Sequence, residues 1–373
     1  MKNYSSSGNR PTILLAPNAF KGSLDATEFC RIMSDELTGD DLHTLCLPMC
    51  DGGDGTARII ASYLDALPQT IQTVDALGRP HQATYYSTAD SAIIDLAAVC
   101  GLKDLKPCEY NVLQANTAGL GKVLLHAASQ GKRRILLGVG GSASIDGGLG
   151  ALVEMGLQIV KPIDHFRNHL LEIVDFNTDK LKENFKGLEW IILADVDNRL
   201  LGPEGAAAIF GPQKGASSLQ VAMLDEALGR FAALLLSKTS CDILPLKHGG
   251  AAGGIAAAFH ALLGARLLSG ADVCIGLSRF KEYLPTVQWV VTGEGKIDAQ
   301  SMHGKIPGVI AALCHRYKVP VMGVAGCAEP PLPDFDRIYT LLDYAVNLPD
   351  ALRQPGYYLR KVAKDLKRNI LNL

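Results

Sequence analysis

Short glycine-rich stretches that also carry charged or hydroxyl side chains are the parts of this sequence best suited to chemistry. The longest is GVGGSASIDGG at residues 138–148, which follows the apolar run 135–137 and precedes a helix-like stretch. Glycine-rich turns between a strand and a helix often bind phosphate, because their bare backbone N–H groups can approach an anion closely. No Gly-Lys-Ser or Gly-Lys-Thr follows, so the lysine of a Walker motif is missing. A cation at such a site has to come from another part of the chain.

Five further polar loops lie where we expect strands to end. They are PNAFKGS (17–23), DGGDGT (51–56), ADVDN (194–198), GGAAGG (249–254) and TGEGKID (292–298). One such loop is usually a plain turn, whereas six are hard to explain as turns alone, since glycine at an element boundary costs entropy without adding packing. Ligands of open α/β sheets bind at the carboxyl ends of the strands, so we expect these loops to carry the function.

The charged residues of these loops suit phosphoryl transfer. That reaction needs cations or backbone N–H groups around the phosphates, carboxylates to hold Mg²⁺, and a group that orients or deprotonates the attacking hydroxyl. The candidate cations are Lys21, Lys214, Lys296 and Lys305, and the candidate acidic residues are Asp51, Asp54, Asp146, Asp195, Asp197, Glu294 and Asp298.

Each of these residues also has a plain structural interpretation. A lysine beside a glycine is most often a solvated surface amine. Asp51, Asp146 and Asp298 could each simply cap the helix that follows. Asp195 fits a structural role least well, because it follows four apolar residues at the end of a predicted strand, where a carboxylate needs a partner or a function.

The hydrophobic pattern predicts an α/β protein with two domains. Strands near 12–16 and 42–47 alternate with helices after Asp25 and near 57–67, and this alternation predicts the start of a parallel sheet. Short strands with turns follow, and the alternation of strands and helices returns from Val287. We therefore predict a discontinuous Rossmann-like domain, residues 1–70 with 285–373, and an inserted α/β domain, residues 71–284. A helix over 218–237 is expected to bury Leu219, Met223, Leu224 and Ala227.

Composition argues against nucleic acid and membrane as partners. Lys and Arg number 36 against 38 Asp and Glu, so the chain has no excess of positive charge that would attract nucleic acid or an anionic membrane. The most apolar long stretch, 255–277, is interrupted by charged residues, and no secretory signal opens the chain. Nine cysteines without a C-x-x-C pattern suggest free thiols in a reducing cytoplasm. We interpret HTLCLPMC, residues 43–50, as a strand rather than a metal clip.

Six stretches of the chain together match a known family. They are APNAFKGSL, DGGDGT, GVGGSASIDGG, ADVDNRLLGPEGAAAIFGPQKGAS, GGAAGG and VVTGEGKIDAQSMHGKIP. On these stretches, which follow the family's order from about residue 13 to residue 327, the chain resembles the bacterial type I glycerate kinases. FGPQKGAS and TGEGKID are the specific ones.

The resemblance implies an ATP-dependent kinase of glycerate that uses Mg²⁺ and usually forms 2-phosphoglycerate. It also implies two α/β domains with the active-site cleft between them. The chain departs from the family pattern at Asn18 and Ala19, at Ser144 and Ile145, and at Lys122. These departures leave open a related hydroxy acid as acceptor, or a non-catalytic sensor of such an acid. A dehydrogenase fails because no G-x-G-x-x-G follows the first strand. The sequence leaves a homo-oligomer open.

Specific roles follow as predictions. Asp195 is the preferred group for orienting or deprotonating the acceptor hydroxyl, with Asp298 and Asp51 as competing choices and Lys21 as a further catalytic residue. Asp195 and Asp298 are the candidate Mg²⁺ ligands. The predicted substrate- and phosphate-binding residues are Asn18, Phe20, Gly52, Gly53, Gly140, Gly141, Ser142, Asp146, Gly147, Gly148, Lys214, Gly293, Glu294, Gly295, His303 and Lys305.

Overall fold

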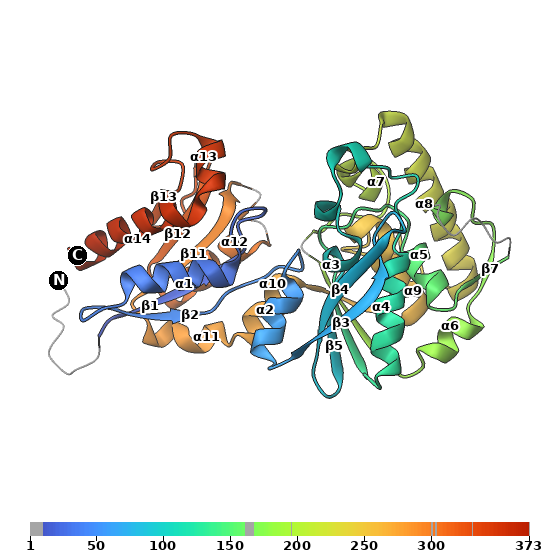
Figure 1. The fold of residues 1–373 in the computed structure, drawn as a ribbon, viewed down its shortest axis with the longest axis horizontal. Helices are drawn as coiled ribbons and strands as arrows, with labels where there is room; N and C mark the ends of the chain where they lie inside the picture. Colours follow the sequence, from blue (N-terminus) through green and yellow to red (C-terminus); the bar gives the residue numbers. More distant parts are fainter. Residues whose placement is uncertain are drawn as a thin grey trace. The chain divides into compact units, whose positions relative to one another are not determined.

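The computed structural model describes residues 10–160, 168–194, 196–299, 301–302, 304–329 and 331–372. Contacts between Cα atoms divide the chain into two compact units. The first unit joins Met1–Asp51 to Ala271–Leu373, and the second is Gly52–Gly270. Both units are α/β in construction (Figure 1).

The first unit is built on a five-stranded parallel sheet in the order β13-β12-β11-β1-β2. Its strands are β1 (Thr12–Pro17), β2 (His43–Cys46), β11 (Trp289–Ile297), β12 (Val321–Ala328) and β13 (Arg337–Thr340). The chain adds β2 on one side of β1 and then returns to add β11 on the other side. The predicted parallel sheet of a discontinuous α/β domain is therefore confirmed, and its strand order is that of flavodoxin-like rather than classic Rossmann folds.

Helices cover both faces of this sheet. Its helices are α1 (Ala26–Leu37), α10 (Gly270–Leu277), α11 (Phe280–Tyr283), α12 (Ile306–Tyr317), α13 (Leu348–Arg353) and α14 (Pro355–Leu371). α1 and α14 lie side by side (Figure 1) and share one core with Ile13 and Leu15 of β1. α12 packs against β1, β11 and β12, and its buried residues lie outside that core, so it covers the opposite face.

Two helix starts in this unit follow the sequence rules for helix termini. Asp25 accepts a hydrogen bond from the backbone N–H of Glu28 at 2.9 Å and so caps α1. Pro307 stands in the first turn of α12, where its missing N–H costs nothing.

The second unit holds a six-stranded mixed sheet in the order β10-β9-β6-β5-β4-β3. β10, β9, β6 and β5 are parallel, and β4 and β3 continue the sheet antiparallel. The strands are β3 (Leu67–Val74), β4 (Pro80–Ser87), β5 (Ser91–Asp95), β6 (Arg134–Gly138), β9 (Glu189–Ala194) and β10 (Arg266–Ser269), with the pair β7 (Gln158–Ile159) and β8 (Phe176–Asn177) outside it. The helices are α2 (Thr56–Tyr63), α3 (Ala97–Cys100), α4 (Ala118–Ser129), α5 (Leu149–Glu154), α6 (Asp179–Asn184), α7 (Ala206–Phe210), α8 (Ser218–Thr239) and α9 (Ile255–Leu263).

The division into units differs from the predicted domain boundaries at α2. The prediction places this helix with the first strands, whereas α2 packs on β4, β5 and β6 of the second unit. Asp95, at the end of β5, accepts hydrogen bonds from the backbone N–H groups of Gly55 at 3.0 Å and Ala57 at 2.9 Å. A buried carboxylate therefore ties the start of α2 to this sheet.

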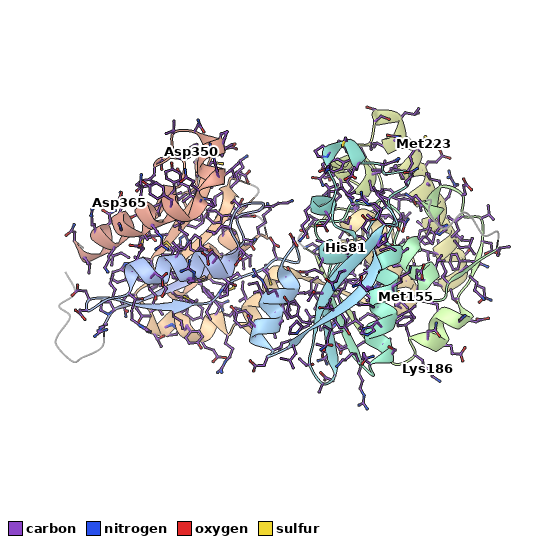
Figure 2. The ribbon with its side chains drawn as sticks, viewed as in Figure 1. His81, Met155, Lys186, Met223, Asp350 and Asp365 are labelled. Atoms are coloured by element: carbon purple, nitrogen blue, oxygen red, sulfur yellow. The ribbon has the colours of Figure 1, made fainter. Side chains whose placement is uncertain are left out.

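Two local predictions are wrong. TGEGKID is not a loop for most of its length, because β11 continues to Ile297 and pairs with β12 as far as Ile297 opposite Ala328. In α8, Leu224 and Ala227 are buried as predicted, but Leu219 and Met223 are exposed; Met223 is labelled in Figure 2. Helical spacing alone does not show where the apolar stripe ends.

The predictions for the cysteines and for residues 43–46 agree with the described chain. All nine cysteines are free thiols. His43 and Cys46 lie in strand β2, as predicted. No helix in the described part of the chain is both long and apolar enough to cross a membrane.

We predict that Asp95→Asn destabilises the protein by about 1–3 kcal/mol. One carboxylate oxygen becomes an NH₂ donor that faces a backbone N–H of α2, so a buried donor loses its acceptor. Urea unfolding measures the change in the free energy of unfolding. Asp54→Asn is the matched control, because Asp54 is exposed and pairs with Lys103 at the surface. Equal stability of the two variants would contradict the role of Asp95.

Candidate functional site

A pocket of about 450 Å³ opens at the carboxyl ends of the strands in the first unit. It lies beside β1 and β11, where the strand order reverses, and this is where doubly wound sheets bind ligands. Its polar lining consists of Lys21, Ser23, Glu294, Lys296, Asp298, Ser301 and Lys305. The pocket therefore gathers residues from two of the predicted site segments, although more than 270 positions separate Lys21 from Glu294 in sequence.

Glu294 is the least satisfied charged group of this pocket. Its side chain is only 15% exposed, and its Oε2 is sealed from solvent without a hydrogen-bond partner among the described residues. Its Oε1 lies 3.8 Å from Nζ of Lys305, too far for a direct hydrogen bond. Burial raises the pKa of the Glu294 carboxyl to about 7, although the nearby Lys305 ammonium acts in the opposite direction.

Asp298 differs from Glu294 because the protein satisfies it. Its carboxylate accepts hydrogen bonds from Ser301 and lies 3.1 Å from Nζ of Lys296. Burial acts to raise the pKa of Asp298, but Lys296 and Ser301 outweigh it and hold that pKa below its usual value. Asp298 is therefore a stable anion at neutral pH, which makes it a weak proton acceptor.

Asn18 and Asp51 form a pair at the ends of β1 and β2. The Asn18 side-chain amide donates to Oδ2 of Asp51 at 2.7 Å, and the backbone N–H of Asn18 donates to the Gly293 carbonyl at 2.8 Å. Asn18 is nearly fully buried. An amide is well suited to this position, because it supplies the donor that a carboxylate lacks.

Close backbone packing explains the first glycine of TGEGKID. A Cβ atom on Gly293 would lie 2.3 Å from the Val324 carbonyl oxygen of the adjacent strand and 3.3 Å from the Phe20 ring. Any side chain here would push apart β11, β12 and the loop that carries Lys21. The glycine therefore sets the spacing of the pocket walls.

The remaining wall of the pocket is apolar and comes from the segment after β13. Leu341, Leu348 and Leu352 line it, and the last two are about half exposed. Asp350 and Asp365, labelled in Figure 2, fasten this segment to α14. Asp350 accepts a hydrogen bond from the Tyr358 hydroxyl, and Asp365 accepts one from the Tyr344 hydroxyl at 2.7 Å.

The glycine-rich loop 138–148 of the second unit is mostly interior. Gly141 is exposed and Gly140 partly so, whereas Ser142, Asp146, Gly147 and Gly148 are buried. A Cβ on Gly140 would lie 2.6 Å from Cα of Gly53, so the first glycines let two loops touch. Only the tip at Gly140 and Gly141 is available to a ligand in this conformation.

Asp146 organises this loop from within. Its fully buried carboxylate accepts five hydrogen bonds: from the Thr117 N–H at 2.8 Å, the Thr117 hydroxyl at 2.7 Å, the Ser144 hydroxyl at 3.1 Å, and the N–H groups of Gly148 and Gly150, each at 3.2 Å. It thus lies at the starts of α4 and α5, where helix dipoles stabilise a negative charge. Its contacts match the helix-capping interpretation.

Lys214 is buried beneath the same loop. Its Nζ donates to the Ser142 hydroxyl at 2.8 Å and to the Ser144 carbonyl at 2.7 Å. Burial lowers the pKa of the Lys214 ammonium to about 7, against the opposing effect of Asp146. In this conformation Lys214 supports the loop rather than facing solvent.

The structure brings the predicted residues together in two groups. The first unit holds Asn18, Phe20, Lys21, Asp51, Gly293, Glu294, Gly295, Asp298 and Lys305. The second holds Gly52, Gly53, Gly140, Gly141, Ser142, Asp146, Gly147, Gly148 and Lys214. Two predicted residues, Asp195 and His303, lie outside the described residues.

Two supporting residues were missed by the sequence analysis. Asp95 ends an apolar strand, which is the same signal that singled out Asp195, and it holds the start of α2 beside DGGDGT. Thr117 bridges Asp146 to the backbone N–H of Ala151 through its hydroxyl, and no local pattern identifies that role.

Comparison with known proteins places the chain in a family. Residues 13–371 match the model of the glycerate kinase family. The chain belongs to this family. It is 32% identical to a glycerate kinase of Bacillus subtilis over 96% of this chain and 97% of that one, and 30% identical to a glycerate 2-kinase of Escherichia coli over 91% and 93%. The crystal structure of a proposed glycerate kinase 2 from Salmonella typhimurium LT2 superposes with a TM-score of 0.80 at 32% identity, covering 98% of this chain and 99% of that one.

Family membership gives a context for the departures from the usual pattern. Ile145 is fully buried in the core of the second unit, and its carbonyl accepts a hydrogen bond from the Asn168 side chain. Its apolar side chain is therefore matched to its surroundings rather than exposed to a ligand. Asn18 is likewise satisfied by Asp51 within the first unit.

We predict a pH-dependent difference between the wild type and Lys214→Met. Above pH 7 the folded lysine loses its proton while the unfolded chain keeps it up to about pH 10.4. The folded state then binds fewer protons, so the wild type gains stability relative to the variant by up to about 1.4 kcal/mol per pH unit between pH 7 and 10. Urea unfolding across this range measures it. The control Lys186→Met, at an exposed site labelled in Figure 2, should show no such slope. A flat difference for Lys214→Met would contradict the lowered pKa.

We also predict that Asn18→Asp lowers the free energy of unfolding at pH 7 by about 1–3 kcal/mol. Two carboxylates would then face each other, and one pKa would rise. The loss should grow as pH rises from 4 to 7, because the shared proton leaves in that window. Asn18→Ala removes the hydrogen bond without adding charge and should cost about 1 kcal/mol at every pH. Identical pH profiles of the two variants in urea unfolding would exclude this repulsion.

Proposed function

We propose that this protein transfers the terminal phosphoryl group of ATP to glycerate, with ADP and 2-phosphoglycerate as products. The observation that carries the proposal is the match to the glycerate kinase family over residues 13–371. A hydroxyl oxygen of the acid forms the new bond to phosphorus, and the bond to the ADP oxygen breaks. The hydroxyl proton passes to a base of the protein.

The residues of the pocket support this assignment. Lys21 and Lys305 are positioned to attract an anionic acid or a transferring phosphate, because both line the pocket at the strand ends. Lys21 is exposed and has no ionic partner among the described residues. In the second unit, the exposed backbone at Gly140 and Gly141 suits contact with phosphate oxygens.

Asp195 is our preferred base. It directly follows β9, and its neighbours Leu193 and Ala194 are buried. Asp298 competes less well, because its pKa is held low. Asp51 already accepts a hydrogen bond from Asn18. Both remain secondary candidates.

The described residues fit magnesium that arrives with the nucleotide. Such an ion is usually held by phosphate oxygens, water and one or two carboxylates, so a cage made of protein alone is unnecessary. Within the described ranges, no cluster of three or more His, Cys, Asp or Glu forms such a cage. Asp298 would serve as a ligand because it is ionised at neutral pH, and Asp195, which lies outside the described residues, stays the second candidate from the sequence. When bound, the ion neutralises charge on the phosphates.

The test is ADP release with ATP and Mg²⁺ in the presence of D-glycerate, tartronate or glycolate. We expect release with D-glycerate, and identification of the phosphorylated acid by NMR distinguishes the 2-phosphate from the 3-phosphate. Preference for another of these acids would indicate a related acceptor. ADP release with none of them would overturn the kinase proposal and favour a sensor.

We predict that Asp195→Asn lowers kcat by at least about 100-fold without unfolding the chain. Loss of the base slows proton removal, whereas the amide keeps the size of the side chain. The matched control is Glu226→Gln on α8, an exposed residue paired with Arg230, which should retain activity. Near wild-type turnover of Asp195→Asn would remove Asp195 from this role.

A further inference from the structure

The pocket of the first unit contains an acid that the protein leaves incompletely satisfied. Glu294 has one oxygen sealed without a partner in the described chain and a second oxygen separated from Lys305 by 3.8 Å. A polar contact of that length has room for a bridging group. A buried carboxylate gains from a further donor at its second oxygen, since among the described residues Lys305 lies beyond hydrogen-bond distance and Ser301 only partly offsets the cost of burial.

The chemistry around this gap limits what the bridging group can be. Glu294 needs a hydrogen-bond donor, which a fully ionised phosphate does not offer. Lys305 and Lys21 line the pocket, and their positive charges attract an anion. A second carboxylate, Asp298, lines the same pocket, so a bare polyanion would meet repulsion. The group that satisfies all of these is a small acid that carries a hydroxyl close to its carboxylate.

The dimensions and the walls agree with a small ligand. A volume of about 450 Å³ lies within the range of small-molecule sites, roughly 300–1,000 Å³. The apolar wall of Leu341, Leu348 and Leu352 reduces hydration on one side, which strengthens the charged contacts on the other. The anchoring of this wall by Asp350 and Asp365 keeps it in place.

We propose that this pocket is the binding site of the acceptor acid, with Lys305 holding its carboxylate and Glu294 accepting a hydrogen bond from its hydroxyl. The inference rests on the proposed function and adds to it a residue that selects for the hydroxyl. Glu294 is then the specificity-determining residue, because an acid without a hydroxyl leaves it unsatisfied. Sites built to hydrogen-bond a hydroxyl reject analogues that lack it much more strongly than apolar pockets reject a missing methylene. Burial raises the pKa of Glu294 against the opposing effects of Lys305 and Ser301, and a donor from the ligand would further stabilise its charged form.

The test measures binding rather than turnover. D-Glycerate and propionate, which lacks both hydroxyls, are titrated into the full-length protein without nucleotide, and ligand-observed NMR gives the dissociation constants. The titrations are run at pH 8.5, above the pKa of about 7 of Glu294, so that its carboxyl is ionised. For Glu294→Gln we expect the affinity for D-glycerate to fall by about 10- to 100-fold, because a charged acceptor is lost. The affinity for propionate should stay the same or increase, since a like charge has been removed. The affinity for D-glycerate divided by the affinity for propionate therefore falls at least 10-fold in this variant.

Two further variants make the result specific. Lys305→Met should weaken both acids, because each has a carboxylate. Glu329→Gln is the matched control: Glu329 is an exposed carboxylate that pairs with Lys296 and does not line the pocket, so both affinities should remain unchanged. Circular dichroism and thermal unfolding check that each variant is folded.

Two outcomes would overturn the inference: no binding of D-glycerate to the wild type, or an unchanged affinity ratio in Glu294→Gln, which includes an equal loss for both acids. These outcomes are distinguishable from failure of the proposed function. A protein that releases ADP with D-glycerate but keeps its affinity ratio in Glu294→Gln remains a kinase with its acceptor site elsewhere. A protein that shows the predicted ratio but releases no ADP binds the acid without phosphorylating it.

Discussion

The parallel pairing of β1 with β11 is the constraint on which the first unit depends. It joins residues 12–17 to residues 289–293, so the whole second unit is inserted between two adjacent strands. Side chains reinforce the pairing: the Thr292 hydroxyl donates to the Ala16 carbonyl, and the Gln288 side chain accepts from the Thr12 N–H. The entropic cost of closing a loop grows only slowly with the length of the loop. Burial of Ile13, Leu15 and Val291 offsets this cost. The same pairing creates the crevice in which Lys21, Glu294 and Lys305 meet.

In the second unit, buried charged side chains determine the shape of loop 138–148. Asp146 and Lys214 would be costly inside a protein if left alone, but five donors satisfy Asp146 and two oxygens accept from Lys214. Their partners all belong to loop 138–148 or to the helix starts beside it. The loop therefore has a defined shape before any ligand arrives, which lowers the entropic cost of binding one. Pre-organisation of this kind suits phosphate contact at its tip.

Most elements were predictable because local patterns carry them. The capping of α1 by Asp25, the start of α12 at Pro307 and the strand–helix alternation at both chain ends follow from periodicity and helix-terminal chemistry. The predictions failed where a neighbouring element, rather than the local sequence, determines the structure of a segment. TGEGKI is strand because β12 pairs with it, and α2 belongs to the second unit because Asp95 and β5 hold it there. Leu219 and Met223 belong to the same apolar pattern as Leu224 but are exposed on the helix surface.

The sequence by itself determined the family, the α/β class and the loops that carry polar groups, because these depend on residue types and their order. Only the tertiary structure decided which of those groups are available. Lys214 and Asp146 are interior and satisfied, whereas Lys21 and Glu294 face a pocket. Glycine, lysine and aspartate look alike in a loop motif whether they bind a ligand or support the chain. Burial and hydrogen-bond partners separate the two cases, and both come from segments distant in sequence.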